Sequence, residues 1–205
     1  ELGRNAPILI DALLKKHDNK YSWALTFDDG GSSAYTTIAK ELQAFKFKAH
    51  FFITTELVGK PCFLKPDQII KLREMGHIIG SHSHTHSEPF SGLNWDSLVE
   101  EWTKSTQVLS DILGEPITTA SVPGGYFSKQ VAKAASQAGI RTLFISDPFQ
   151  TPFRINDCWI FGRYTIFKHT SDSEALAISL GDSFPCLKQW SSWKVKKIAK
   201  TLLGN

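Results

Sequence analysis

Short apolar runs alternate along this chain with segments of helical periodicity, and this alternation is the feature that most restricts its fold. Strand patterns lie at residues 21–27, 76–80, 118–122 and 142–146, and a further run follows at 159–166. Two parallel strands need a long crossover between them, which is usually a helix. The alternation therefore predicts an α/β fold with a mainly parallel sheet. The expected architecture is a distorted, incomplete (β/α) barrel.

Helices are predicted where apolar residues recur at helical spacing between recognisable ends. The first crossover helix follows Ser32 and Ser33, and the longest one stops at Gly114. The others are expected at 66–75 and 128–138. We expect one domain over 1–205, with an N-terminal helix within 1–19, a core at 20–147 that carries the motifs, and a C-terminal amphipathic helix at 190–203.

Two short polar runs follow two of the predicted strands. Residues 26–30 read Thr-Phe-Asp-Asp-Gly, and residues 82–86 read His-Ser-His-Thr-His. In a βα barrel the catalytic groups gather at the carboxyl ends of the strands. Both runs fall at such ends, so they are the candidate functional site.

The residue types in these runs are those of a catalytic metal site. Two imidazoles and one carboxylate, with a fourth position left to water, form the ligand set of catalytic zinc. His82 and His86 are spaced so that both can reach one ion. Neighbouring residues at a strand end point in different directions, so Asp28 can accept a proton from the bound water if Asp29 is the ligand. A solvated polar loop is the simpler interpretation, but three alternating histidines after a buried strand argue against it.

These residues resemble those of the polysaccharide deacetylases that share the chitooligosaccharide deacetylase homology domain. The first motif of that family, Thr-Phe-Asp-Asp-Gly, is unchanged at 26–30, and the second, His-Ser/Thr-x-x-His, matches 82–86. Residues 122–126, Val-Pro-Gly-Gly-Tyr, are similar to the third motif. The resemblance covers about residues 20–147 in the expected order, and the last third of the chain matches poorly.

The resemblance implies a role for each of these residues. Asp28 would be the catalytic base, and the backbone N–H of Gly124 would help to bind the oxyanion. Asp29, His82 and His86 would hold one divalent metal ion, for which zinc is expected. The implied reaction is the hydrolysis of an N-acyl group, most simply N-acetyl, on an amino sugar of a glycan or glycan precursor. The implied fold is the incomplete (β/α) barrel of the polysaccharide deacetylase type.

Two features of the family are missing from the sequence. Its third motif usually opens with an arginine that pairs with the catalytic aspartate, and Ser121 stands there instead. Arg163 is the candidate to replace it, and an exposed arginine on an edge strand is the alternative. The late Leu-x-Leu-His motif, which provides the general acid, is matched only in part by residues 166–169. His169 is the candidate acid, and an exposed loop histidine is the alternative.

Two other functions compete with this interpretation. A sugar-binding or metal-binding module without catalysis would explain the missing arginine and histidine, although both aspartates are retained. A different metal-dependent amidohydrolase could use His82 and His84 as a His-x-His ligand pair. In that case His86 would not bind the metal, and the preceding Asp-Asp-Gly would fit poorly.

Composition restricts the partners and the compartment. The net charge is only +3 and the C-terminal lysines are confined to one end, so a last helix that packs its tryptophans on the barrel is expected. Nucleic acid is then not a partner, and contact of that helix with a membrane surface is the alternative. No apolar stretch approaches the roughly 20 residues that span a bilayer. Three cysteines without Cys-x-x-Cys spacing indicate reduced thiols and favour the cytoplasm, or the cell envelope or secretion if a signal segment was removed.

Overall fold

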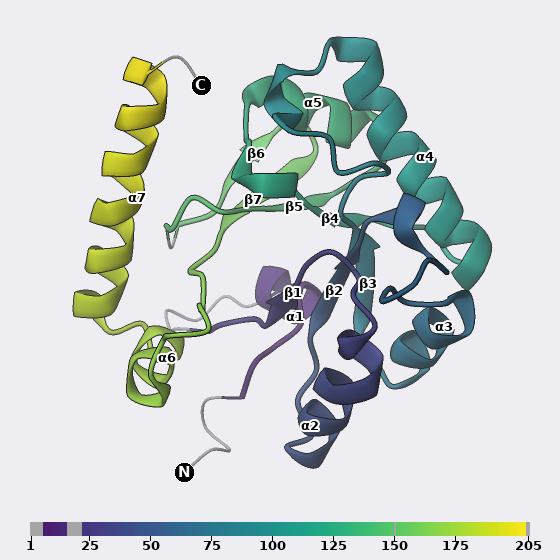
Figure 1. Ribbon diagram of the computed structural model, residues 1–205, viewed down its shortest axis with the longest axis horizontal. Helices are drawn as coiled ribbons and strands as arrows, with labels where there is room; N and C mark the ends of the chain where they lie inside the picture. The colour runs from purple at the N-terminus through teal and green to yellow at the C-terminus, as the bar shows by residue number, and fades with distance from the viewer. Residues whose placement is uncertain (1–5, 16–21, 150, 204–205) are drawn as a thin grey trace.

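A curled sheet forms the centre of the computed structural model, which describes residues 6–15, 22–149 and 151–203 (Figure 1). In this part of the chain the strand order is β1-β2-β3-β4-β5-β7-β6, and every neighbouring pair is parallel except β7 with β6. The predicted α/β fold with an incomplete barrel is confirmed. The strands are β1 (Thr26–Phe27), β2 (His50–Ile53), β3 (Ile78–Ser81), β4 (Thr119–Ser121), β5 (Thr142–Ile145), β6 (Phe153–Ile155) and β7 (Cys158–Gly162).

Crossover helices cover the outer face of the sheet (Figure 1). The longest, α4, begins where the Asn94 side chain accepts a hydrogen bond from the Ser97 N–H (2.9 Å), and it ends at Gly114, whose φ of 69° suits glycine. These helices are α2 (Ala39–Ala44), which continues the π-helical turn η2 (Ala34–Ile38), α3 (Pro66–Glu74), α4 (Trp95–Leu113) and α5 (Lys129–Gln137). Short 3₁₀ turns are η3 (Thr55–Leu57), η4 (Phe90–Gly92) and η5 (Pro123–Gly125).

Alternating side chains of the buried strands divide the core between the two faces of the sheet. On β2, Phe51 and Ile53 pack in the cluster beneath the helices, whereas Phe52 packs with Phe144 on the inner side of the curl. The helix α1 (Ile10–Lys15) closes that inner side with Ile10, whose side chain is fully buried. Residues 6–9 of the predicted N-terminal helix region are described and are not helical, and residues 1–5 and 16–19 of it lie outside the described residues.

Two edges of the sheet differ from the sequence prediction. The strand predicted at 21–27 forms a ladder only at Thr26–Phe27, because its neighbour β2 begins at His50, opposite Thr26, and Tyr21 lies outside the described residues. The strand predicted at 159–166 ends at Gly162, so Arg163 follows it directly. The antiparallel strand β6 was not predicted, because its residues are largely exposed and show no buried alternation.

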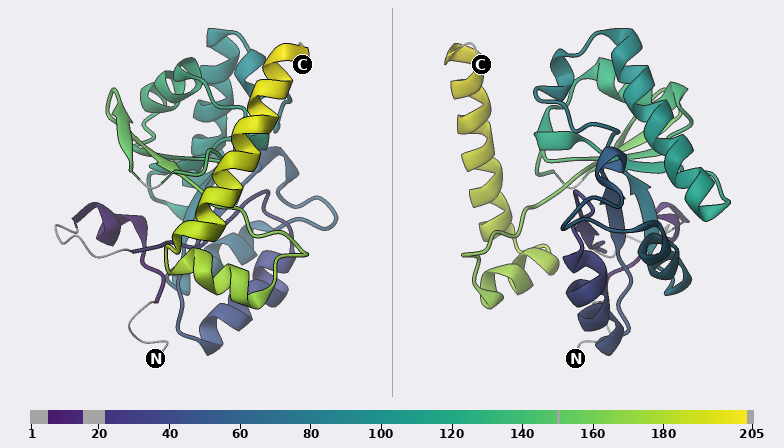
Figure 2. Two further views of the ribbon diagram at one scale, coloured as in Figure 1. Left: turned by 90° about the vertical axis from the view of Figure 1, so that its left-hand side faces the viewer. Right: turned by 45° about the vertical axis from the view of Figure 1, so that its right-hand side comes forward.

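The C-terminal helix α7 (Ser183–Leu203) begins before the predicted residue 190 and stands to one side of the sheet, joined to it through α6 (Asp172–Ser179) (Figures 1 and 2). Trp190 of this helix is 38% exposed and lies under Lys194 Nζ at 3.8 Å, and the packing of the tryptophans on the barrel stays a prediction. The helix α7 attaches to the segment leaving β7, where the Gln189 side chain exchanges two hydrogen bonds with the Thr165 backbone (2.7 and 2.8 Å). Of the helices that the structure describes, none has the length and apolar content to cross a membrane.

Candidate active site

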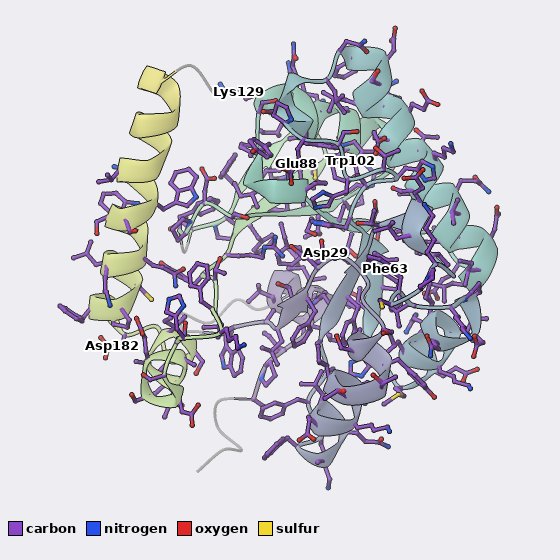
Figure 3. All side chains as sticks on the ribbon, viewed as in Figure 1. Asp29, Phe63, Glu88, Trp102, Lys129 and Asp182 are labelled. Atoms are coloured by element: carbon purple, nitrogen blue, oxygen red, sulfur yellow. The ribbon has the colours of Figure 1, made fainter. Side chains whose placement is uncertain are left out.

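Strand ends of the curled sheet bring the two polar runs together near the middle of the molecule, where Figure 3 labels Asp29. Asp28 and Asp29 follow β1, and His82 follows β3, with β2 between these two strands. The backbone of the two runs is tied to the segment after β2, since the Thr54 N–H donates to the Asp29 carbonyl (3.3 Å) and the Thr55 N–H to the Ser83 carbonyl (3.3 Å).

Three side chains converge on one point. Asp29 Oδ1 lies 3.3 Å from His82 Nε2 and 3.6 Å from His86 Nε2. One ligand atom from each residue lies within 4.8 Å of the other two, and this is the cluster of the described residues that could hold a metal ion. The His82 side chain is buried and that of Asp29 is 63% exposed, so the cluster is closed on its inner side and open on its outer side.

The hydrogen bonds of His82 turn its Nε2 atom toward Asp29. His82 Nδ1 lies 3.1 Å from the Ser121 carbonyl oxygen, which can only accept, so Nδ1 carries the hydrogen, and a neutral ring in this tautomer has its lone pair at Nε2. That lone pair faces the carboxylate oxygen of Asp29. Two acceptors at this distance are stabilised by a cation between them, and a carboxylate with two imidazoles is a suitable donor set for zinc. The residues present therefore fit a divalent metal ion.

The backbone at this cluster is held in an unusual conformation. Asp29, Ser83 and His86 have positive φ angles of 72°, 64° and 58°, which residues other than glycine adopt at a cost of about 1–3 kcal/mol each. Local hydrogen bonds offset this cost: Ser83 Oγ accepts from the His86 N–H (3.1 Å), and Ser81 Oγ accepts from the Ser83 N–H (3.0 Å). Strain that is concentrated on candidate ligands such as Asp29 and His86 is typical of a functional site.

Glu101 of α4 holds the same loop from the helix side. Its carboxylate accepts hydrogen bonds from the backbone N–H groups of His84 and Thr85 (2.9 Å each) and from the Thr85 hydroxyl (2.7 Å). Sequence analysis did not identify Glu101, because a glutamate in an amphipathic helix has the pattern of a solvated residue. A contact with a loop 16 residues away leaves no signal in helical periodicity.

Asp28 is clamped by two donors from distant strands. Arg163 binds its carboxylate at two points, with Nη1 2.8 Å from Oδ1 and Nη2 2.8 Å from Oδ2, and Ser121 Oγ donates to Oδ1 at 3.1 Å. Burial raises the pKa of Asp28, but the Arg163 guanidinium and the other neighbours outweigh it, so that its pKa lies below the usual value. The structure thus places Arg163 against the carboxylate that the motif arginine would contact if it were present at position 121. These contacts hold Asp28 ionised.

Gly124 lies in the turn after β4, with a φ of 57°. A Cβ at this position would lie 2.7 Å from the Tyr126 ring and 3.3 Å from Glu88 Oε1, so only glycine fits there. Glu88 Oε1 is in turn 3.7 Å from His86 Nδ1, which places the turn on the His86 side of the cluster. The role of the Gly124 N–H as an oxyanion donor stays a prediction.

His84 and His169, the other two histidines considered from the sequence, do not contact the cluster of Asp29, His82 and His86 through any hydrogen bond or ring contact given for the described residues. His84 Nδ1 lies 2.8 Å from the Thr55 hydroxyl, so this ring is used within the loop, and the alternative His82-x-His84 ligand pair gains no support from the geometry. His169 is exposed and stacks on Phe167, with ring centroids 5.5 Å apart, in the segment that leads to α6. This placement favours the loop interpretation of His169 over a role as general acid.

Comparison with known sequences connects this geometry to characterised proteins. Residues 15–143 match the family model described as polysaccharide deacetylase. The peptidoglycan-N-acetylmuramic acid deacetylase PdaA of Bacillus subtilis is 28% identical over 162 residues, which are 72% of this chain and 57% of that protein. The peptidoglycan-N-acetylglucosamine deacetylase PgdA of Listeria monocytogenes is 32% identical over 111 residues, covering 54% of this chain and 23% of that protein. The match spans only between 5% and 58% of the length of such curated relatives.

Solved structures show the same fold. The polysaccharide deacetylase BC0361 of Bacillus cereus superposes with a TM-score of 0.72 and 20% identity, over 86% of this chain and 57% of that one. At this level of identity the likeness concerns the fold alone. It agrees with the curled α/β sheet, whose strand ends carry the cluster of Asp29, His82 and His86.

Proposed function

The chain belongs to the polysaccharide deacetylase family, and we propose on that basis that it is a metal-dependent hydrolase that removes an N-acyl group, most simply acetyl, from an amino sugar of a glycan or glycan precursor. The observation that carries the proposal is the convergence of Asp29, His82 and His86 beside a carboxylate, Asp28, that is clamped by Arg163. A metal-ligand cluster next to an oriented base is an arrangement suited to amide hydrolysis.

Asp29, His82 and His86 would hold one divalent ion, for which zinc is the candidate. When bound there, such an ion supplies Lewis-acid polarisation of the amide carbonyl and lowers the pKa of water, to about 7 in known zinc sites. The exposed side of Asp29 leaves room for water and substrate.

The protein's own groups would orient the reaction and move its proton. Asp28 Oδ1 already accepts from Arg163 and from Ser121, whereas Oδ2 accepts only from Arg163 among the described residues. Because each carboxylate oxygen has two lone pairs, Oδ2 is the atom of Asp28 with a lone pair left to accept the proton of the attacking water. The Gly124 N–H would donate to the oxygen on which negative charge develops.

A binding module without catalysis is the weaker candidate. Its main motivation was the loss of the motif arginine at Ser121, and the two-point contact of Arg163 with Asp28 supplies a cation from the segment after β7 instead. Its second motivation was the missing late histidine, and the structure supplies no replacement for that residue among the described residues discussed above.

The proposed activity is tested by following amine and acetate release from a panel of N-acetylated amino sugars that includes chitooligosaccharides and peptidoglycan fragments. We expect release by the zinc-loaded chain, loss of release after treatment with a chelator, and recovery when zinc is added back. Glycan binding without acetate release from any member of the panel would contradict the proposal and favour the binding module.

The proposed role of Arg163 predicts a specific loss of turnover. Replacing it with Lys keeps the positive charge but removes the planar fork that contacts both oxygens of Asp28, so the carboxylate loses its fixed orientation. General-base catalysis typically contributes about 10²–10⁴-fold, and we expect a partial loss of about tenfold or more, because Asp28 keeps its carboxylate but loses its orientation. Zinc content should stay at one equivalent, since Arg163 contacts none of the three ligand side chains through a hydrogen bond or ion pair in the described structure. Unchanged turnover would remove Arg163 from the proposed mechanism.

A further inference from the structure

Ser121 stands where the family carries an arginine, yet its side chain contacts both halves of the site. It is fully buried at the end of β4. Its hydroxyl oxygen lies 2.6 Å from His82 Nδ1 and 3.1 Å from Asp28 Oδ1. One hydroxyl therefore lies between a candidate metal ligand and the candidate base.

The direction of these two hydrogen bonds follows from the donors and acceptors present. The Ser121 carbonyl oxygen also lies 3.1 Å from His82 Nδ1 and can only accept, so the hydrogen is on Nδ1. The His82 Nδ1–H hydrogen bond is then bifurcated between the Ser121 carbonyl oxygen and the Ser121 hydroxyl oxygen. The hydroxyl hydrogen is donated to Asp28, which the Arg163 contact holds ionised. The chain of bonds runs from His82 Nδ1–H to Ser121 Oγ–H to Asp28 Oδ1.

We propose that Ser121 is a positioning residue that fixes His82 with its Nε2 lone pair toward the metal and, through the same hydroxyl, fixes Asp28 beside it. This inference rests on the proposed metal site. A metal-ligating histidine usually donates its second ring N–H to an acceptor that sets its tautomer and orientation. Here that acceptor is shared with the base, and Arg163 binds the same carboxylate from the segment after β7. Ser121 and Arg163 thus hold together the carboxylate that the family holds with one arginine.

The test is the zinc dissociation constant of three variants, measured by competition with a chromophoric chelator. Ser121→Ala keeps the backbone carbonyl but removes the hydroxyl, and we expect zinc binding to weaken about tenfold or more. Ser121→Thr retains the hydroxyl and should restore most of the affinity. Thr119→Val is the matched control: it changes a buried hydroxyl on the same strand that has no hydrogen-bond partner among the described residues, and it should bind zinc like the unmodified chain.

Turnover of Ser121→Ala at saturating zinc gives the second readout. We expect it to be reduced as well, because Asp28 loses one of its three side-chain hydrogen bonds and one of the two residues that hold it. Equal zinc affinity in Ser121→Ala and the unmodified chain would overturn the inference, and so would equal weakening in Thr119→Val. A chain that binds zinc tightly, loses affinity in Ser121→Ala and yet hydrolyses no amide would support the positioning role while contradicting the proposed deacetylase function.

Discussion

Asp28→Asn is expected to retain the fold and one equivalent of zinc while losing turnover by about 10²–10⁴-fold, the contribution typical of a general base. The asparagine side chain has nearly the same shape, and its oxygen can still accept from Arg163 or Ser121. Its amide group cannot take up the proton that Asp28 Oδ2 is proposed to accept. The measurement is the rate of amine release at saturating zinc, compared with the metal content of the same preparation.

Two controls separate the loss of a base from a loss of structure. Thermal unfolding should show a folded variant, and zinc content should match that of the unmodified chain because Asp28 is not among the three converging ligands. Turnover near that of the unmodified chain would mean that another group activates the water. The clamp formed by Arg163 and Ser121 would then need another explanation.

The cluster of Asp29, His82 and His86 could be predicted from sequence because each of its two parts is local in the chain. Asp29 lies in one short motif at a strand end and the two histidines lie in another, and the family resemblance supplied the choice of ligands among these residues. Arg163 is 135 residues from Asp28 along the chain. Strand alternation alone did not decide whether its side chain faces the site or the solvent. Only the curl of the sheet, which brings the end of β7 toward β1, decides that contact.

Other parts of the site have no signal in one sequence. Ser121 was recognised as a departure, but its contact with His82 depends on the register in which β3 pairs with β4. Glu101 belongs to a helix whose polar positions all resemble solvated ones. The placement of α7 is a further example, because an amphipathic pattern does not specify the surface that a helix contacts, and α7 attaches to the segment after β7 through Gln189.

The largest effect on metal binding is expected at His82. Its side chain is buried, its Nδ1 is committed to Ser121, and its Nε2 faces Asp29 Oδ1. Alanine at this position leaves only two of the three converging ligands, so stoichiometric zinc should be lost on dialysis. Metal content by mass spectrometry, together with chelator competition, measures this loss.

His84→Ala is the matched control, because it removes an imidazole from the same loop two residues away. The His84 ring contacts the Thr55 hydroxyl rather than the cluster, so this variant should cost about 1 kcal/mol of stability, as for a single hydrogen bond, and retain one equivalent of zinc. His86→Ala should behave like His82→Ala, since its Nε2 lies 3.6 Å from Asp29 Oδ1. Equal zinc loss in His82→Ala and His84→Ala, with retention in His86→Ala, would instead establish a His-x-His pair and remove His86 from the proposed ligand set.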